Sequence, residues 1–226
     1  RGKEEQGVCT IRMMSSCVQR LLLFFALAFV TRHSRTFTDA SLTDPSSTAY
    51  EAYLDFVSTI NYANQKFMGN DDQVSVFWEV DLDSETLKLV VAAACQGWVG
   101  FGISETGAMR GADMVIFEAS KRELNDYYSL DYVMPLLDHC PSDWSMVQSV
   151  VTDSFIAFEA SRPLDTNDTQ DIRIQNDSDI YISPTIVIAA WGDYPSLSFH
   201  GSGRAVRSTL RFYQQEPAEP TRSYNI

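Results

Sequence analysis

Basic residues are few in this sequence of 226 residues, which has 17 Lys and Arg against 30 Asp and Glu and a formal net charge of -13. Nucleic-acid binding draws much of its affinity from clustered Lys and Arg side chains, so we expect no nucleic-acid partner. Common catalytic motifs are also missing, including the nucleophile elbow, the Walker loop, the CxxC pair and HExxH. The sequence therefore offers no catalytic constellation for acyl transfer, phosphoryl transfer or zinc-dependent hydrolysis.

Long hydrophobic runs are absent except for one near the N-terminus. An apolar run covers residues 21–30, follows Arg20 and precedes the polar residues 31–34. This order is typical of a secretory signal peptide, and the run is too short to span the hydrocarbon core of a bilayer. We expect residues 1–36 to comprise an upstream segment and a signal peptide, and the protein to enter the secretory pathway. The alternative is an uncleaved anchor that holds the protein at a membrane.

Cysteine is scarce as well, with four in the chain. Cys9 and Cys17 lie before or within the expected signal peptide, which leaves Cys95 and Cys140 as a pair in an oxidising compartment. We expect these two to form a disulfide, and the alternative is a pair of buried free thiols.

Two N-glycosylation sequons agree with export. They begin at Asn167 and Asn176, in an acidic polar stretch over residues 165–179. The carboxylates of that stretch, Asp165, Asp168, Asp171, Asp177 and Asp179, could hold a calcium ion, but they lack the spacing of an EF-hand, so we interpret it as a solvated acidic loop.

Short strands dominate the body of the chain. In residues 74–82, Val74, Val76 and Trp78 alternate with other side chains at the period of a half-buried strand. Turn-forming residues separate further apolar segments, and no alternation of strands with helices is apparent, which favours an antiparallel β-sandwich of the all-β class. The other expected strands cover residues 86–94, 99–103, 113–118, 127–134, 146–151, 155–160, 180–191 and 207–212.

The sandwich is expected to span residues 74–213, after a lead-in at 37–73 and before a linker or tail at 214–226. Within the lead-in, residues 50–60 have helical spacing of apolar side chains but are aromatic enough for a first strand, so both remain open. The alternation predicts a set of buried core side chains. They are Trp78, Val80, Ile156, Phe158, Ile186, Ile188, Leu210 and Phe212.

Several motifs of this sequence resemble those of the DOMON domain. A glycine-rich strand and turn at residues 97–104 precede a Met-x-x-Ala-Asp approach to the next strand at 107–116, and an aromatic-His-Gly-Ser pattern ends at Arg204. Asp143-Trp144 and residues 158–164 resemble the middle strands. The resemblance covers residues 74–213 and is greatest to the N-terminal domain of dopamine β-monooxygenase-like proteins, which are copper- and ascorbate-dependent. It implies an immunoglobulin-like arrangement of two sheets.

Some members of this family bind haem b through a methionine and a histidine. By motif, Met109 and His200 fall where those ligands are expected, and Arg204 could pair with a haem propionate. Such a site would carry single electrons, alone or with a redox partner domain. The alternative for Met109 and His200 is an ordinary loop methionine and a structural histidine.

Histidine is too scarce for the copper-dependent catalysis that the family resemblance would imply. The chain has only His33, His139 and His200, whereas the two-copper hydroxylases of the family hold their metals with several histidines and a methionine. Copper is therefore not expected in this chain. Two functions stay open: a haem-binding electron-transfer module, or a non-catalytic module that binds a small ligand or another protein at the N-terminus of a copper monooxygenase.

Overall fold

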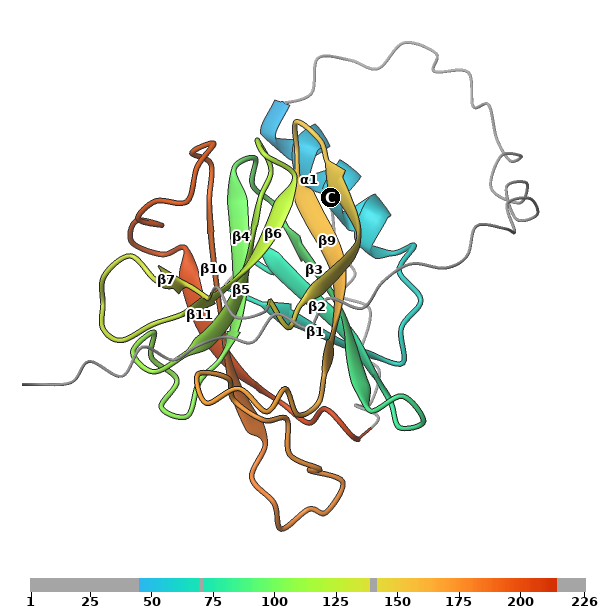
Figure 1. The fold of residues 1–226 in the computed structure, drawn as a ribbon. Helices are drawn as coiled ribbons and strands as arrows, with labels where there is room; N and C mark the ends of the chain where they lie inside the picture. Colours follow the sequence, from blue (N-terminus) through green and yellow to red (C-terminus); the bar gives the residue numbers. More distant parts are fainter. Residues whose placement is uncertain (1–44, 70, 139–141, 215–226) are drawn as a thin grey trace, which may run out of the picture. The chain divides into compact units, whose positions relative to one another are not determined.

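A computed structural model describes residues 45–69, 71–138 and 142–214 of the chain. These residues form one helix and two antiparallel sheets, which confirms the β-sandwich (Figure 1). The helix is α1 (Pro45–Val57), and the strands are β1 (Asn64–Met68), β2 (Val74–Asp81), β3 (Thr86–Ala93), β4 (Trp98–Ile103), β5 (Asp113–Glu118), β6 (Glu123–Tyr128), β7 (Leu136–Leu137), β8 (Ser145–Val151), β9 (Ile156–Pro163), β10 (Thr185–Gly192) and β11 (Ala205–Leu210).

The strand order places β4 at the centre of the larger sheet. One sheet has five strands in the order β1-β2-β3-β9-β8, and the other has six in the order β11-β10-β4-β5-β6-β7. Strand β4 therefore pairs with β10 on one side and with β5 on the other, so residues far apart in sequence lie in register across three strands.

The main hydrophobic core lies between the two sheets. Its members come from alternate positions of the strands, as the period-2 pattern predicts. Of the side chains expected in this core, Trp78, Ile156, Phe158, Leu210 and Phe212 are buried, and Val80 is partly buried against them.

Two of the residues expected in the core lie on the outer face of β10, which points away from the core. Val187, Ala189 and Trp191 point into the core, while Ile186 and Ile188 are only half-buried and belong to the opposite face. The prediction was wrong because β10 is apolar on both faces, and periodicity alone does not say which face of such a strand meets the other sheet.

Helix α1 covers the outer face of the five-stranded sheet. Of the two interpretations left open for residues 50–60, the structure therefore confirms the helix, which ends at Val57. Tyr53 and Val57 pack with Phe77, Val90 and other side chains in a second buried cluster. The Tyr53 hydroxyl lies 2.6 Å from Ser75 Oγ. This cover explains why β2 is buried on both faces over its first five residues.

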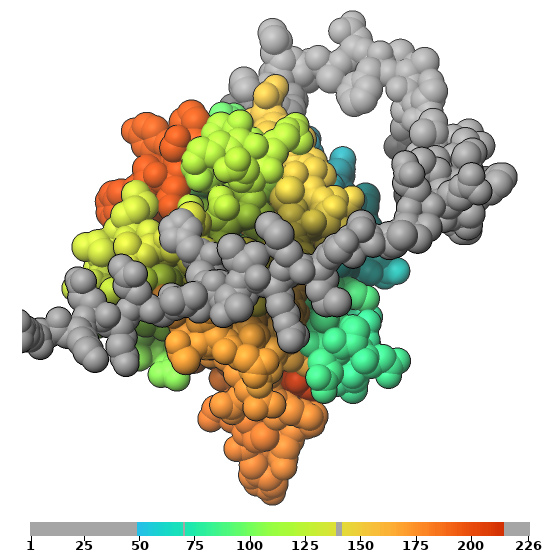
Figure 2. Space-filling model, in the orientation of Figure 1, coloured from blue at the N-terminus to red at the C-terminus, as the bar shows by residue number. Residues whose placement is uncertain are grey.

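Three further segments differ from the expected strands. The segment expected at 127–134 is a strand only to Tyr128 in β6, and Tyr132, Val133 and Met134 are exposed in the loop that follows. The segment expected at 180–191 is strand only from Thr185, and the preceding loop projects from the surface in Figure 2 (orange). Strand β1, which pairs with β2, had not been expected as a strand.

The expected signal peptide, with its apolar run at 21–30, lies outside the described residues, as do Cys140 and the tail from residue 215. Among the helical residues that the structure describes, none form a helix long and apolar enough to cross a membrane. Secretion therefore stays a prediction.

Gly97 precedes β4 at a close crossing of two backbones. Its N–H donates to the Gly192 carbonyl, and its own carbonyl accepts from Ala119 N–H. An added Cβ would overlap the Tyr194 carbonyl oxygen and would lie 2.7 Å from the Asp193 carbonyl carbon. Backbone atoms cannot move aside as a flexible side chain can.

We therefore expect Gly97→Ala to lower the free energy of unfolding by about 3 kcal/mol, the upper part of the usual range for overpacking. Urea denaturation followed by tryptophan fluorescence would measure it. Gly100→Ala is the matched control, because its Cβ would lie closest to the Ile116 side chain, at 3.2 Å, and would meet backbone only at 3.7 Å, an ordinary contact distance. Equal losses for the two variants would contradict the prediction.

Candidate functional site

The outer face of the six-stranded sheet carries a cavity of about 780 Å³, within the size range of small-molecule and cofactor sites. We call it the outer-sheet cavity. Side chains from alternate positions of four strands form its floor, and three loops form its walls. The floor includes Trp98, Gly100, Gly102, Met114, Ile116, Ile188, Ala190, Ala205 and Arg207; the loops contribute Gly107, Met109, Tyr132, Val133, Met134, Pro135, Leu197, Ser198, Phe199 and His200.

Small residues flatten the middle of this floor. Gly100, Ala190 and Ala205 lie in register across β4, β10 and β11, so no large side chain rises from that row. In the neighbouring row, a Cβ added to Gly102 would lie 2.7 Å from Met114 Cγ and 2.9 Å from the Asp113 carbonyl oxygen. The glycines of β4 thus keep open a surface that a flat group could approach closely.

Met109 lies on the loop between β4 and β5, and hydrogen bonds hold that loop in place. Ser104 Oγ donates to the Ala108 carbonyl at 2.7 Å and accepts from Gly107 N–H at 3.0 Å. Ala112 N–H donates to the Met109 carbonyl at 3.0 Å. Gly107 has a φ of 74°, a conformation that favours glycine. The loop therefore presents Met109 to the cavity from a fixed backbone.

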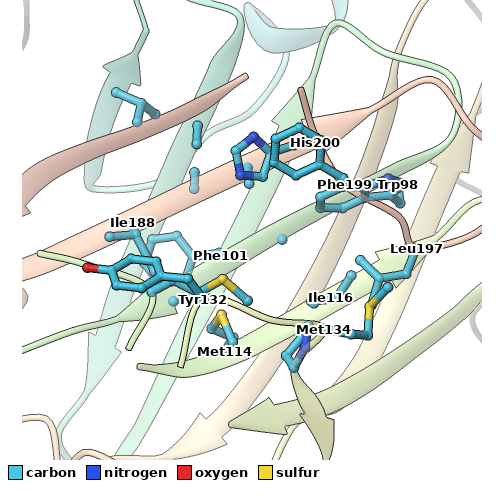
Figure 3. Close-up of a pocket in the computed structure, with 18 of the residues that line it drawn as sticks. Trp98, Phe101, Met114, Ile116, Tyr132, Met134, Ile188, Leu197, Phe199 and His200 are labelled. Atoms are coloured by element: carbon cyan, nitrogen blue, oxygen red, sulfur yellow. The ribbon is translucent and has the colours of Figure 1, made fainter. Parts of the chain in front are cut away.

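His200 lies on the long connection between β10 and β11. Its Nδ1 is 2.6 Å from the Gly201 carbonyl oxygen. A carbonyl can only accept, so Nδ1 carries the proton and Nε2 keeps a free lone pair in the neutral ring. Figure 3 shows His200 beside Phe199 on one side of the cavity, with Met114 and Tyr132 on the other. The two rings on that segment have centroids 5.0 Å apart.

Arg204 closes the base of the same connection. Its Nη2 is 2.6 Å from Asp193 Oδ2, and its carbonyl accepts from Trp191 N–H at 3.1 Å. On the same connection, Leu197 N–H donates to Glu118 Oε2 at 2.9 Å. Burial acts to raise the pKa of Glu118, but the bonds from Lys121 and Leu197 outweigh it and hold that pKa below its usual value. These contacts fix the segment that carries His200.

The structure thus brings two of the three expected cofactor-binding residues together. Met109 and His200 both line the outer-sheet cavity, while Arg204 is not among its lining residues. The guanidinium at the cavity belongs to Arg207 instead, a residue that the sequence motifs did not indicate. The spacing of Arg207 could have indicated this, because residues two positions apart in a strand, such as Ala205 and Arg207, lie on the same face.

The other predicted sites lie elsewhere. Cys95 is a buried thiol whose Sγ is 3.4 Å from the Trp98 carbonyl oxygen, and burial raises its pKa to about 12. Because Cys140 lies outside the described residues, the disulfide stays a prediction. Asn167 and Asn176 are exposed on the connection between β9 and β10, where oligosaccharides would have room.

The solved structures that resemble this chain include two cytochrome domains. The cytochrome b domain of pyranose dehydrogenase from Coprinopsis cinerea is 14% identical, with a TM-score of 0.49 over 66% of this chain and 81% of that one. The cytochrome domain of Myriococcum thermophilum cellobiose dehydrogenase is 13% identical, with a TM-score of 0.43 over 64% of this chain and 78% of that one. Likenesses this distant do not bear on what this chain binds.

Comparison with protein families gives a match that covers more than half of the chain. The matched model is that of the DOMON domain, and the match runs over residues 70–185. It includes Met109 and the strands β4 and β5 that form much of the cavity floor. The chain therefore belongs to the DOMON domain family, as its motifs had predicted.

Proposed function

We propose that this protein is a haem b-binding electron-transfer module. The observation that supports the proposal is the position of Met109 and His200, which come from two connections about 90 residues apart and line one apolar cavity. These are the residues that the family motifs indicate as axial ligands. A thioether and an imidazole are a known pair of haem ligands.

The cavity fits a flat, apolar group. The row of Gly100, Ala190 and Ala205 leaves its floor free of large side chains, and Met114, Ile116 and Ile188 supply apolar contact around that row. The proton on His200 Nδ1 leaves the Nε2 lone pair free, so a metal could bind through Nε2.

Met109 and His200 would hold haem b in this cavity, and the bound group would supply single-electron transfer. The residues of this chain would hold the group, exclude water from it and set its polarity. The hydrogen bond from His200 Nδ1 to the Gly201 carbonyl would fix the ring orientation. Arg207 is placed to pair with a propionate, the role that the motifs had suggested for Arg204.

Exposed apolar side chains stand at the rim of the cavity. Tyr132, Val133, Met134 and Phe199 are each more than half exposed. Such a cluster is suited to contact with a redox partner domain, which we propose as the source or acceptor of electrons. Export through the secretory pathway belongs to this proposal as well. A longer copper-dependent monooxygenase as the parent protein belongs to the alternative, the non-catalytic module.

The direct test is absorption spectroscopy of the protein expressed with added haem precursor. We expect the Soret and α bands of a low-spin, six-coordinate haem in the wild type. Met109→Ala and His200→Ala should each lose the six-coordinate spectrum, because each removes one axial ligand.

Met146→Ala is the matched control for the methionine, since Met146 is 43% exposed on β8 of the other sheet. It should keep the wild-type spectrum. A wild-type protein that takes up no haem would instead favour the non-catalytic module, with a small apolar ligand in the same cavity.

A further inference from the structure

Three carboxylates meet away from the outer-sheet cavity, on the side of the larger sheet that faces the core. They belong to Asp113 on β5, Asp126 on β6 and Asp171 on the connection between β9 and β10, and each offers an oxygen within 4.8 Å of the others. We call them the carboxylate cluster. Asp113 and Asp126 are each 2% exposed, and the side chain of Asp171 is 4% exposed.

Neighbouring groups orient two of the three carboxylates, each through one oxygen. Asp113 Oδ2 accepts from Arg162 Nη1 at 2.7 Å and from Ile172 N–H at 2.9 Å. Asp126 Oδ2 accepts from Asp143 N–H at 3.1 Å. These bonds hold the two carboxylates in place beside Asp171.

Two oxygens of the cluster are buried without a hydrogen-bond partner, namely Asp126 Oδ1 and Asp171 Oδ2. Asp171 Oδ2 has Arg162 Nη2 at 3.6 Å, too far for a hydrogen bond. A buried polar atom without a partner costs free energy, and native proteins rarely leave one so. The two oxygens therefore indicate a missing ligand at this place.

The charges point to a cation of two positive charges. Arg162 supplies one positive charge to the cluster, so the three carboxylates, when ionised, would carry two further negative charges that a divalent cation could balance.

We propose that the carboxylate cluster binds a calcium ion. All the candidate ligand atoms are oxygens, which hard cations prefer and which argue against zinc or copper. Calcium lies about 2.4 Å from its ligands, so two ligands on opposite sides of the ion are about 4.8 Å apart. The three cluster oxygens all lie within 4.8 Å of one another, so one ion could contact all of them. Asp143, next to the cluster, and water would complete the six to eight ligands. The ion would join β5 and β6 to the connection between β9 and β10.

The proposal changes the interpretation of one acidic residue in the 165–179 loop. Asp171 turns inward and is buried, while Asp165 remains at the surface in an ion pair with Arg173 at 3.3 Å. Asp165 therefore serves as a matched control, in the same loop and with the same charge.

The test is the melting temperature of the EDTA-treated, dialysed protein with and without calcium chloride. We expect saturating calcium to raise the melting temperature by about 5 °C or more, because the ion binds only the folded state. Asp126→Asn should abolish that rise and Asp165→Asn should keep it. The Asn variant removes a buried charge without changing the side-chain volume, so we expect it to fold.

Terbium luminescence gives a second readout that does not depend on a variant of a ligand. The Trp144 ring lies 5.4 Å from the Arg162 guanidinium carbon, close enough to the cluster to sensitise a bound Tb³⁺ ion. Trp144→Phe should lose most of that emission while retaining the calcium-dependent rise. A wild type that shows neither calcium stabilisation nor terbium emission would overturn the proposal, as would loss of the rise in Asp165→Asn alone.

Discussion

Replacing Arg162 with methionine is expected to lower the free energy of unfolding by about 4 kcal/mol, within the range measured when one partner of a buried ion pair is removed. The Arg162 side chain is fully buried on the inner face of β9. Its Nη1 holds Asp113, its Nη2 donates to the Ile172 carbonyl at 3.2 Å, and its guanidinium lies over the Trp144 ring. Methionine has a similar reach but can make none of the polar contacts.

The loss should depend on pH. Burial raises the pKa of Asp113 even beside Arg162, which acts to lower it. Without the guanidinium, that pKa rises further above its unfolded value, so the folded state binds a proton more readily than the unfolded chain does. Stability contributed by that proton is present at low pH and declines as pH rises through the folded pKa. The difference between Arg162→Met and wild type should therefore be smaller at pH 5 than at pH 8.

Urea denaturation in the presence of EDTA would measure both effects without interference from a bound cation. Arg173→Met is the matched control, because the Arg173 side chain is 70% exposed and its ion pair with Asp165 is at the surface. Surface ion pairs contribute about 0–1 kcal/mol. A loss below about 1 kcal/mol for Arg162→Met would show that the buried pair is not needed for stability.

Ala190→Phe is expected to weaken haem binding by about 100-fold while the protein remains folded. Ala190 lies on the cavity floor, in register with Gly100 on one side and Ala205 on the other. A phenylalanine there would rise from the row of small residues and occupy the space of the ligand. The strain of overpacking, about 1–3 kcal/mol, corresponds to a loss of affinity of up to about 100-fold.

Titration of the haem-free protein with haem, followed at the Soret band, would give the haem affinities of the wild type and of Ala190→Phe. Thr209→Phe on β11 is the control: Thr209 lies two strand periods from Ala205 on the same face but is not among the residues that line the cavity. It should bind haem as the wild type does. Equal affinities for Ala190→Phe and the wild type would place the ligand elsewhere on the molecule.

The family motifs located more of the site than the strand pattern did. Met109 and His200 were found because each belongs to a short motif, and the structure places both at one cavity. Arg204 belongs to such a motif too, yet it pairs with Asp193 at the base of the loop. A motif reports that a residue is present at a position, whereas the direction of its side chain depends on which partners the fold brings near.

The carboxylate cluster could not have been found in the sequence. Asp113, Asp126 and Asp171 are spread over three segments, and the last of them appeared to be one of several solvated acids. Arg162 and Asp113 are 49 positions apart and meet only because β9 and β5 face each other across the core. Spacing in a sequence indicates neighbours within one element, and this cluster has no two members in the same element.

By itself, the sequence determined the fold class and most of the strands, because the alternation of apolar and polar side chains reflects the pleat of a half-buried strand. Only the tertiary structure decided which face of β10 meets the core. That strand is apolar on both faces. Ile188 lies on the floor of the outer-sheet cavity, while Val187 is buried between the sheets. A local pattern fixes how side chains alternate, but the packing of the second sheet and of the loops fixes what each face touches.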